Sequence, residues 1–171
     1  MSKLPILKVL ISILFYVSMI SMIFSIPFIL ILSIMPERVP FKFSVKEAEE
    51  VAKVDAELII YIIALVISCG FFTYALYLFR KVLELFSKKI IFDTRIITNL
   101  NQCGSAILIG YFISIVSEFI YTAIATQKVN ITLNFGLGGS IATICLGLFF
   151  IVLGEVFQKA KNIKEENDLT V

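Results

Sequence analysis

Four long stretches with almost no charge constrain this chain more than any other feature. Residues 9–35 contain 27 residues in a row without a charged side chain, residues 58–79 contain 22, and residues 129–154 contain 26. A fourth stretch, residues 103–127, has Glu118 as its only charge. A helix needs roughly 20 mostly apolar residues to cross a bilayer, and lipid offers the backbone no hydrogen-bond partners. The pattern therefore predicts an all-α, polytopic integral membrane protein with four transmembrane helices in contact with the lipid bilayer.

The charged blocks between these stretches divide the chain into spans and connecting segments. We expect the first stretch to remain as an anchor, because a signal peptide has an apolar region of only about 7–15 residues. The prediction is one membrane domain, residues 1–171, with spans near 9–35, 58–79, 104–126 and 137–157, an outer loop at 36–57, a cytosolic hairpin at 80–103 and a cytosolic tail at 158–171.

The distribution of basic residues predicts the orientation of the chain. Lysine and arginine are enriched in short cytosolic segments. With the N-terminus inside, the inner segments hold ten basic residues and the outer loops hold five. We therefore predict a multi-pass protein of the cell membrane with both termini in the cytosol.

The composition argues against several classes of function. The chain has no histidine, and its three cysteines form no CxxC motif, so ligands for zinc and thiol-redox chemistry are missing. We expect neither a metal nor a cofactor. A net charge of +2 is too small to predict direct binding of nucleic acid. The sequence has no recognisable nucleophile–base pair or phosphate-binding loop, so we expect that the protein is not an enzyme.

Glu118 is the one ionisable residue deep inside a predicted span. A carboxylate near the bilayer centre costs about 3 kcal/mol on insertion scales, so it needs a proton or polar neighbours. Ser114 and Tyr121 share its helix face at helical spacing. These three residues form a candidate intramembrane polar site. They could bind a proton or ligand, or they could serve only as a structural hydrogen-bonding group.

Small residues recur at helical spacing on the third and fourth spans. Close helix contact is the expected role of such rows, and a homo-oligomer is left open. The candidate helix-packing residues are Gly110, Thr143, Gly147 and Gly154.

The segment between the second and third spans has apolar residues at helical spacing on both sides of a break. It fits a hairpin of short amphipathic helices against the inner leaflet, and it fits equally well two extensions of the spanning helices. Asp93 or Thr94 is placed to cap the helix after the break.

The chain closes on a charged tail whose apolar residues still follow helical spacing. We expect the fourth helix to run about two turns beyond the membrane and to stop near Asn167. Leu169 and Val171 would then lie beyond the helix, after an acidic stretch. The tail could dock into a groove on another protein or remain a solvated terminus. The candidate partner-binding residues are Glu166, Asp168, Leu169, Thr170 and Val171.

The ending EVFQKAKNIKEENDLTV resembles the C-terminal signature of a family of small bacterial membrane proteins, domain of unknown function 2975. Phe92, Leu100 and Gly104 also fall where that family has a Phe, a Leu and a Gly before its third helix. The resemblance implies four spans and no established activity. It also implies a regulatory partner, because family members are often encoded beside a small helix-turn-helix regulator.

Two functional hypotheses follow. The first is a non-enzymatic membrane protein whose cytosolic face, made by the 80–103 segment and the tail, binds a cytosolic protein such as a transcriptional regulator. The second is a small transporter or permeation module that uses Glu118. The sequence favours the first, because a single buried acid without a basic partner makes a poor pathway.

Overall fold

A computed structural model describes residues 4–34, 56–90, 92–126 and 139–169 of the chain. These residues form four helices and no strand: α1 (Leu4–Ile34), α2 (Ala56–Ser87), α3 (Thr94–Thr126) and α4 (Ser140–Leu169). Each helix is long and apolar enough to cross a membrane. The prediction of an all-α chain with four helices of membrane-spanning length is confirmed.

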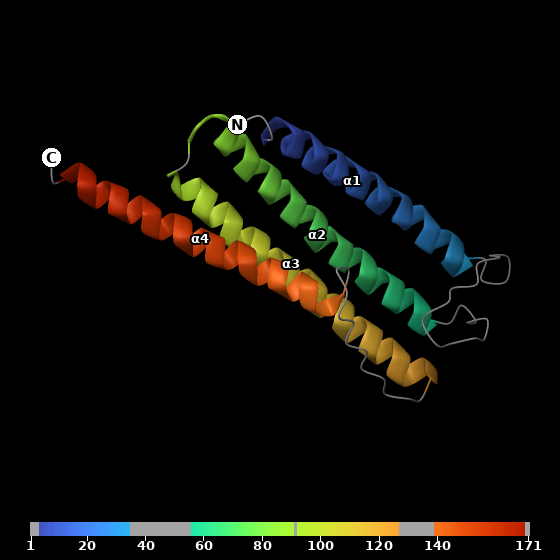
Figure 1. The fold of residues 1–171 in the computed structure, drawn as a ribbon. Helices are drawn as coiled ribbons and strands as arrows, with labels where there is room; N and C mark the ends of the chain where they lie inside the picture. The colour runs from blue at the N-terminus through green and yellow to red at the C-terminus, as the bar shows by residue number, and fades with distance from the viewer. Residues whose placement is uncertain (1–3, 35–55, 91, 127–138, 170–171) are drawn as a thin grey trace.

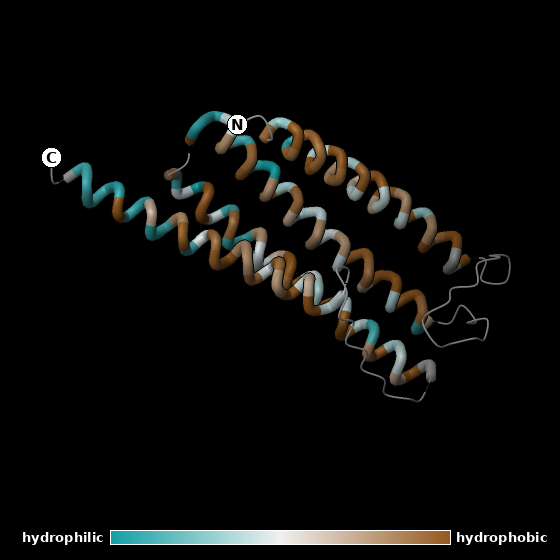
Figure 2. Tube along the Cα trace, in the orientation of Figure 1, coloured by the Kyte–Doolittle hydropathy of each residue, from teal (hydrophilic) through white to brown (hydrophobic). Residues whose placement is uncertain are grey.

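The helices lie side by side in chain order, with alternating directions (Figure 1). α1 packs on α2, α2 on α3 and α3 on α4, and among the described elements α1 contacts α2 alone. Apolar residues cover most of the length of the helices, whereas hydrophilic residues gather near the α2–α3 turn and in the last turns of α4 (Figure 2). We call residues 88–93 the connector, and the end of the molecule that carries it the connector end.

The best-packed part of the molecule lies toward the connector end. The side chains of Val82, Ile96 and Leu100 are fully buried there between α2 and α3. α4 closes this core with aromatic contacts: the rings of Phe79 and Phe150 have centroids 5.0 Å apart, and those of Phe86 and Phe157 are 5.6 Å apart.

The 80–103 segment forms extensions of the spanning helices, which was one of the two interpretations left open. α2 continues without a break to Ser87, and α3 begins at Thr94, so the short amphipathic helices expected on the cytosolic side are not separate elements. The physical reason is the burial of Val82 and Ile96, which face a neighbouring helix rather than a lipid surface.

The connector is defined by local signals at both helix ends. Lys89 has a φ of 59°, in the left-handed region that favours glycine, and the amide of Ile90 donates to the Leu85 carbonyl at 3.1 Å, as in a Schellman turn. At the start of α3, the Asp93 carboxylate accepts a hydrogen bond from the Arg95 amide at 2.8 Å. The expected cap of this helix is therefore Asp93.

The fourth helix is longer than expected. It continues through Asn167 to Leu169, so the predicted stop at Asn167 is wrong and Leu169 belongs to the helix. Pairs one turn apart support the extension: Lys161 lies 3.5 Å from the Glu165 carboxylate, and Gln158 donates to Asn162 at 2.9 Å.

Several predicted segments lie outside the described residues. They are nearly all of the outer loop 36–57, the first residues of the 137–157 span, and the tail residues Thr170 and Val171. Where the bilayer begins and ends on each helix stays a prediction.

Replacing Leu100 with alanine tests the packed core. Leu100 is 0% exposed, so Leu100→Ala leaves a cavity and should lower the free energy of unfolding by about 2–5 kcal/mol. Denaturant-induced unfolding in detergent micelles measures this loss. The matched control is Leu146→Ala on α4, where the side chain is 49% exposed and a change within about 0.5 kcal/mol is expected. Equal losses in the two variants would contradict the assignment of the core.

Candidate functional site

Glycines allow α3 to approach both of its neighbours closely. A Cβ atom on Gly110 would lie 2.9 Å from the Cβ of Phe71 on α2, and the Ser68 hydroxyl donates to the Gly110 carbonyl at 2.7 Å. On the α4 side, a Cβ on Gly147 would lie 2.8 Å from the Leu108 side chain. Any larger residue at Gly110 or Gly147 would push the helices apart.

A second close contact of α3 and α4 lies nearer the connector end. A Cβ on Gly154 would collide with Oδ1 of Asn101. This oxygen is buried and accepts no hydrogen bond from the described residues. Thr143, the fourth residue of the predicted packing set, is half-buried and donates at 3.3 Å to the carbonyl of Gly139, the residue before α4.

Gly104, named above only for its match to the family pattern, is also a helix-packing residue. A Cβ placed there would lie 2.5 Å from the Gly147 carbonyl and 2.7 Å from the Ile151 side chain, so the two glycines face each other across α3 and α4. Helical spacing on one helix cannot identify such a pair, because it depends on the register between two helices.

Glu118 lies on the exposed surface of α3. Its helix neighbour Tyr121 turns toward α2, where its ring stacks on Tyr61 with centroids 4.8 Å apart. Ser114 is half-buried, and its carbonyl accepts a hydrogen bond from Ser117 at 2.9 Å. Tyr121 thus contacts α2, whereas the printed hydrogen bond of Ser114 lies within α3. A common polar site with Glu118 stays a prediction.

The pairing of α2 and α3 also gives the position of Glu118 along the helix axis. Tyr121 is level with Tyr61, four residues from Glu57 at the start of α2. At 1.5 Å per residue, Glu118 then lies about 10 Å from the level of Glu57, measured along the helices toward the connector end. This part of α3 extends past the start of α4 (Figure 1), so among the described helices it packs on α2 alone.

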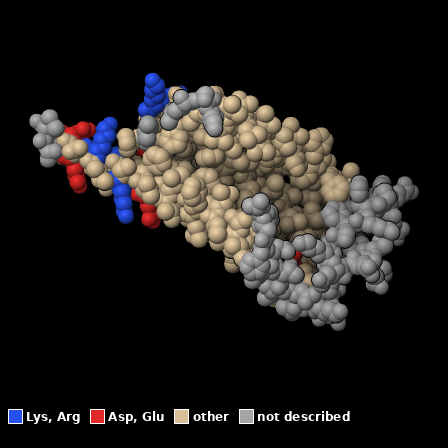
Figure 3. Space-filling model, in the orientation of Figure 1, with Lys and Arg blue, Asp and Glu red and all other residues tan. Residues whose placement is uncertain are grey.

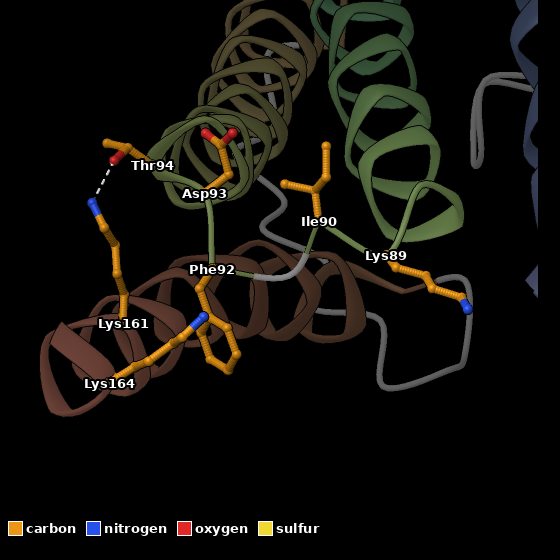
Figure 4. A pocket seen from close by; sticks show the side chains of 7 residues that line it. All are labelled: Lys89, Ile90, Phe92, Asp93, Thr94, Lys161 and Lys164. Carbon is orange, nitrogen blue, oxygen red and sulfur yellow. Dashed lines mark hydrogen bonds between the residues drawn. The ribbon is translucent and has the colours of Figure 1, made fainter. Parts of the chain in front are cut away.

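Charged side chains gather at the connector end, whereas uncharged residues cover the described length of the molecule in the same view (Figure 3). An open pocket of about 540 Å³ lies there between the connector and α4. Lys161 donates to the Thr94 hydroxyl at 2.7 Å, and the Lys164 ammonium lies 5.2 Å from the centre of the Phe92 ring. These contacts fix α4 against the connector (Figure 4).

Asp93 is the one carboxylate lining this pocket, and Arg95 neutralises it. The guanidinium donates to the Asp93 carboxylate at 2.8 Å and 3.1 Å. These hydrogen bonds, followed by the one from the Arg95 amide, lower the pKa of Asp93 from 3.8 to about 2. Because the pKa of the folded state is depressed, the stabilisation from the ionised cap is complete above pH 3.8 and is lost as the pH falls toward 2.

Beyond the connector, α4 extends past the ends of the other described helices (Figure 1). Residues 162–168 are all exposed, including the acids Glu165, Glu166 and Asp168. Ile163 keeps 64% of its surface exposed and Val156 keeps 54%, whereas Phe157 on the opposite face packs against the core. We call residues 165–169 the α4 tip.

Within the described residues, no group of three or more histidine, cysteine, aspartate or glutamate side chains could hold a metal ion. The arrangement is that of a helical membrane protein with a charged end. A family model, "Protein of unknown function (DUF2975)", matches residues 43–171. The chain belongs to this family, which confirms the resemblance of its C-terminal signature. No match was found among curated proteins or among solved structures.

The titration of Asp93 tests the electrostatics of the connector. In Arg95→Gln, the midpoint for the Asp93 carboxyl should rise from about 2 toward 3.8, yet stay below 3.8 because the amide of residue 95 still donates to it. The carboxyl carbon signal in an NMR titration reports this midpoint. Lys161→Gln is the control, since Lys161 acts on Asp93 through space as the smallest of the causes. A larger shift in the control than in Arg95→Gln would contradict the assignment.

Proposed function

We propose that the protein is a non-enzymatic membrane anchor that holds a cytosolic protein partner with its connector end. The observation that carries the proposal is the α4 tip, a helical extension that passes the connector and exposes the side chains of residues 165–168.

The contacts with the connector mark where the extension begins. Lys161 meets Thr94 and Lys164 meets Phe92, so residue 165 is the first to lie wholly past the connector. The next residues on α4 have no described helix beside them. Exposed Ile163 and Val156 continue as an apolar strip down one side of α4 toward the membrane. An amphipathic helix can bind a partner by laying such an apolar face into a hydrophobic groove.

The negative charge of the α4 tip favours a partner with a basic surface. Glu165, Glu166 and Asp168 follow one another within four residues, and a surface that binds DNA phosphates is rich in lysine and arginine. The helix-turn-helix regulators implied by the family resemblance are proteins of that kind. Binding to the α4 tip would hold such a regulator at the membrane.

The tip is anchored firmly enough to act as a fixed platform. Phe157, two turns before it, contacts Phe86 of α2, and Phe150 contacts Phe79. Both contacts join the core that holds α2, α3 and α4 together. A partner would therefore meet a helix end whose base is held by packing. The proposal requires both termini in the cytosol, which the excess of inner basic residues supports.

Deleting residues 167–171 tests the proposal. The deletion removes the last turn of α4 and leaves every core contact, so insertion and helix content should be unchanged while crosslinking of a small DNA-binding protein to the chain in native membranes is lost. Glu155→Gln is the matched control, because it removes an exposed acid of α4 below the connector and should retain the partner. An unchanged crosslink in the deletion variant would refute the proposal.

The second hypothesis, permeation through Glu118, has a separate test. Glu118 is exposed and lies on a part of α3 that packs on α2 alone among the described helices, an arrangement that offers no enclosed route. We expect proton and cation flux into liposomes containing the protein to match that of empty vesicles. We also expect Glu118→Gln to leave it unchanged. A flux that the wild-type chain supports and Glu118→Gln abolishes would favour the transporter instead.

A further inference from the structure

An apolar groove of about 370 Å³ runs between α1 and α2. Met19, Met22 and Ile26 line it from α1, and Gly70 and Tyr74 line it from α2. Gly70 leaves open space in the wall of the groove: a Cβ there would reach only the end of the Met22 side chain, at 3.4 Å. The hydroxyls of Ser18 and Thr73 are 2.5 Å apart and satisfy each other, so the wall presents almost no polar surface.

Two cations stand at the end of this groove nearest the connector. The Arg80 guanidinium lies 5.8 Å from the centre of the Phe15 ring and 5.4 Å from that of Tyr16. The Lys81 ammonium lies 4.5 Å from the centre of the Tyr77 ring. Phe15 and Tyr77 both line the groove, with ring centroids 6.0 Å apart. Aromatic rings of the groove thus hold both cations beside its mouth.

These cations are available to an external anion. Neither Arg80 nor Lys81 forms an ion pair with a described residue. The nearby Glu84 carboxylate pairs with Lys88 at 2.9 Å, and Arg80 acts on it only through space. Arg80 donates only a long hydrogen bond of 3.4 Å, to the Tyr16 hydroxyl.

The length and depth of the groove match one leaflet of a bilayer. From Phe15 to Ile26, α1 rises roughly 17 Å at 1.5 Å per residue, against about 15 Å for half of a hydrocarbon core. Arg80 is the first charged residue after the uncharged stretch 58–79. The cations therefore lie at the level where phosphate groups of lipids are found, and the groove lies at the level of acyl chains.

We propose that the groove between α1 and α2 binds an anionic phospholipid, with one acyl chain along Gly70 and Met22 and the phosphate at Arg80 and Lys81. Apolar shape and positive charge are combined at one site, as in basic pockets between membrane helices that bind acidic head groups. A zwitterionic lipid would gain the apolar contacts but little from the two cations. The site is independent of the α4 tip and of any protein partner.

Lipid binding to the full chain, measured by native mass spectrometry from detergent micelles, tests the site. The probes are phosphatidylglycerol and phosphatidylcholine with identical acyl chains. We expect one phosphatidylglycerol to bind per chain and to bind more tightly than phosphatidylcholine. In Arg80→Gln/Lys81→Gln, the affinity for phosphatidylglycerol should fall on the order of 25-fold, about fivefold for each cation, and that for phosphatidylcholine should change little.

Two further variants separate the head-group and acyl-chain contacts. Arg95→Gln removes a cation at the same end but outside the groove, and it should retain the lipid. Gly70→Leu fills the groove without touching the cations, and it should weaken both lipids equally. Circular dichroism confirms that each variant keeps its helices. Equal binding of both lipids in every variant would show ordinary boundary lipid and overturn the proposal. A dimer that the wild-type chain forms and that Gly70→Leu disrupts would also overturn the proposal, because the groove would then bind a second copy of the chain.

Discussion

The close approach of α3 to its two neighbours is the contact on which the rest of this structure depends. Lipid is as apolar as a leucine side chain, so helices in a bilayer associate through close packing and hydrogen bonds rather than through the hydrophobic effect. Gly110 brings α3 against α2, and the facing pair Gly104 and Gly147 brings it against α4. These backbone contacts set the register that buries Val82 and Leu100 together at the connector end. The core of the molecule is a product of helix positions that glycines permit.

α1 shows what happens where such contacts are absent. It packs on α2 alone among the described elements, and the short hydrogen bond between Ser18 and Thr73 joins the two helices near their middle. Gly70 is the one glycine at this contact, and it leaves open space instead of closing it. The family match begins at residue 43, so it covers the three helices that share the core and excludes the helix that borders the groove. Under the proposed lipid site, lipid would fill the space that remains between α1 and α2.

The sequence predicts the number and type of elements well, for a physical reason. A long uncharged stretch in lipid must satisfy its own backbone, and a helix is the simple way to do so. The same stretch says little about partners. Val82 and Ile96 have helical spacing whether they lie on a lipid surface or against another helix, so the two interpretations of the 80–103 segment could be separated only by their burial in the structure. Glu118 illustrates a second limit. Tyr121 follows Glu118 at helical spacing, as the sequence shows. Spacing along one helix cannot show, however, that the Tyr121 ring stacks on Tyr61 of another helix.

At the connector end, one lysine side chain contacts both the start of α3 and the α4 tip. Lys161 bonds to Thr94 and also pairs with Glu165 on the next turn, so one ammonium group joins the start of α3 to the start of the α4 tip. Because Asp93 caps α3 and is itself neutralised by Arg95, the Thr94 hydroxyl is held in a fixed position for that bond. A partner that draws Glu165 to its own basic side chains would release Lys161 from one of its two contacts. Under the proposed function, a partner bound to the α4 tip would therefore lie next to the contact between α4 and the start of α3.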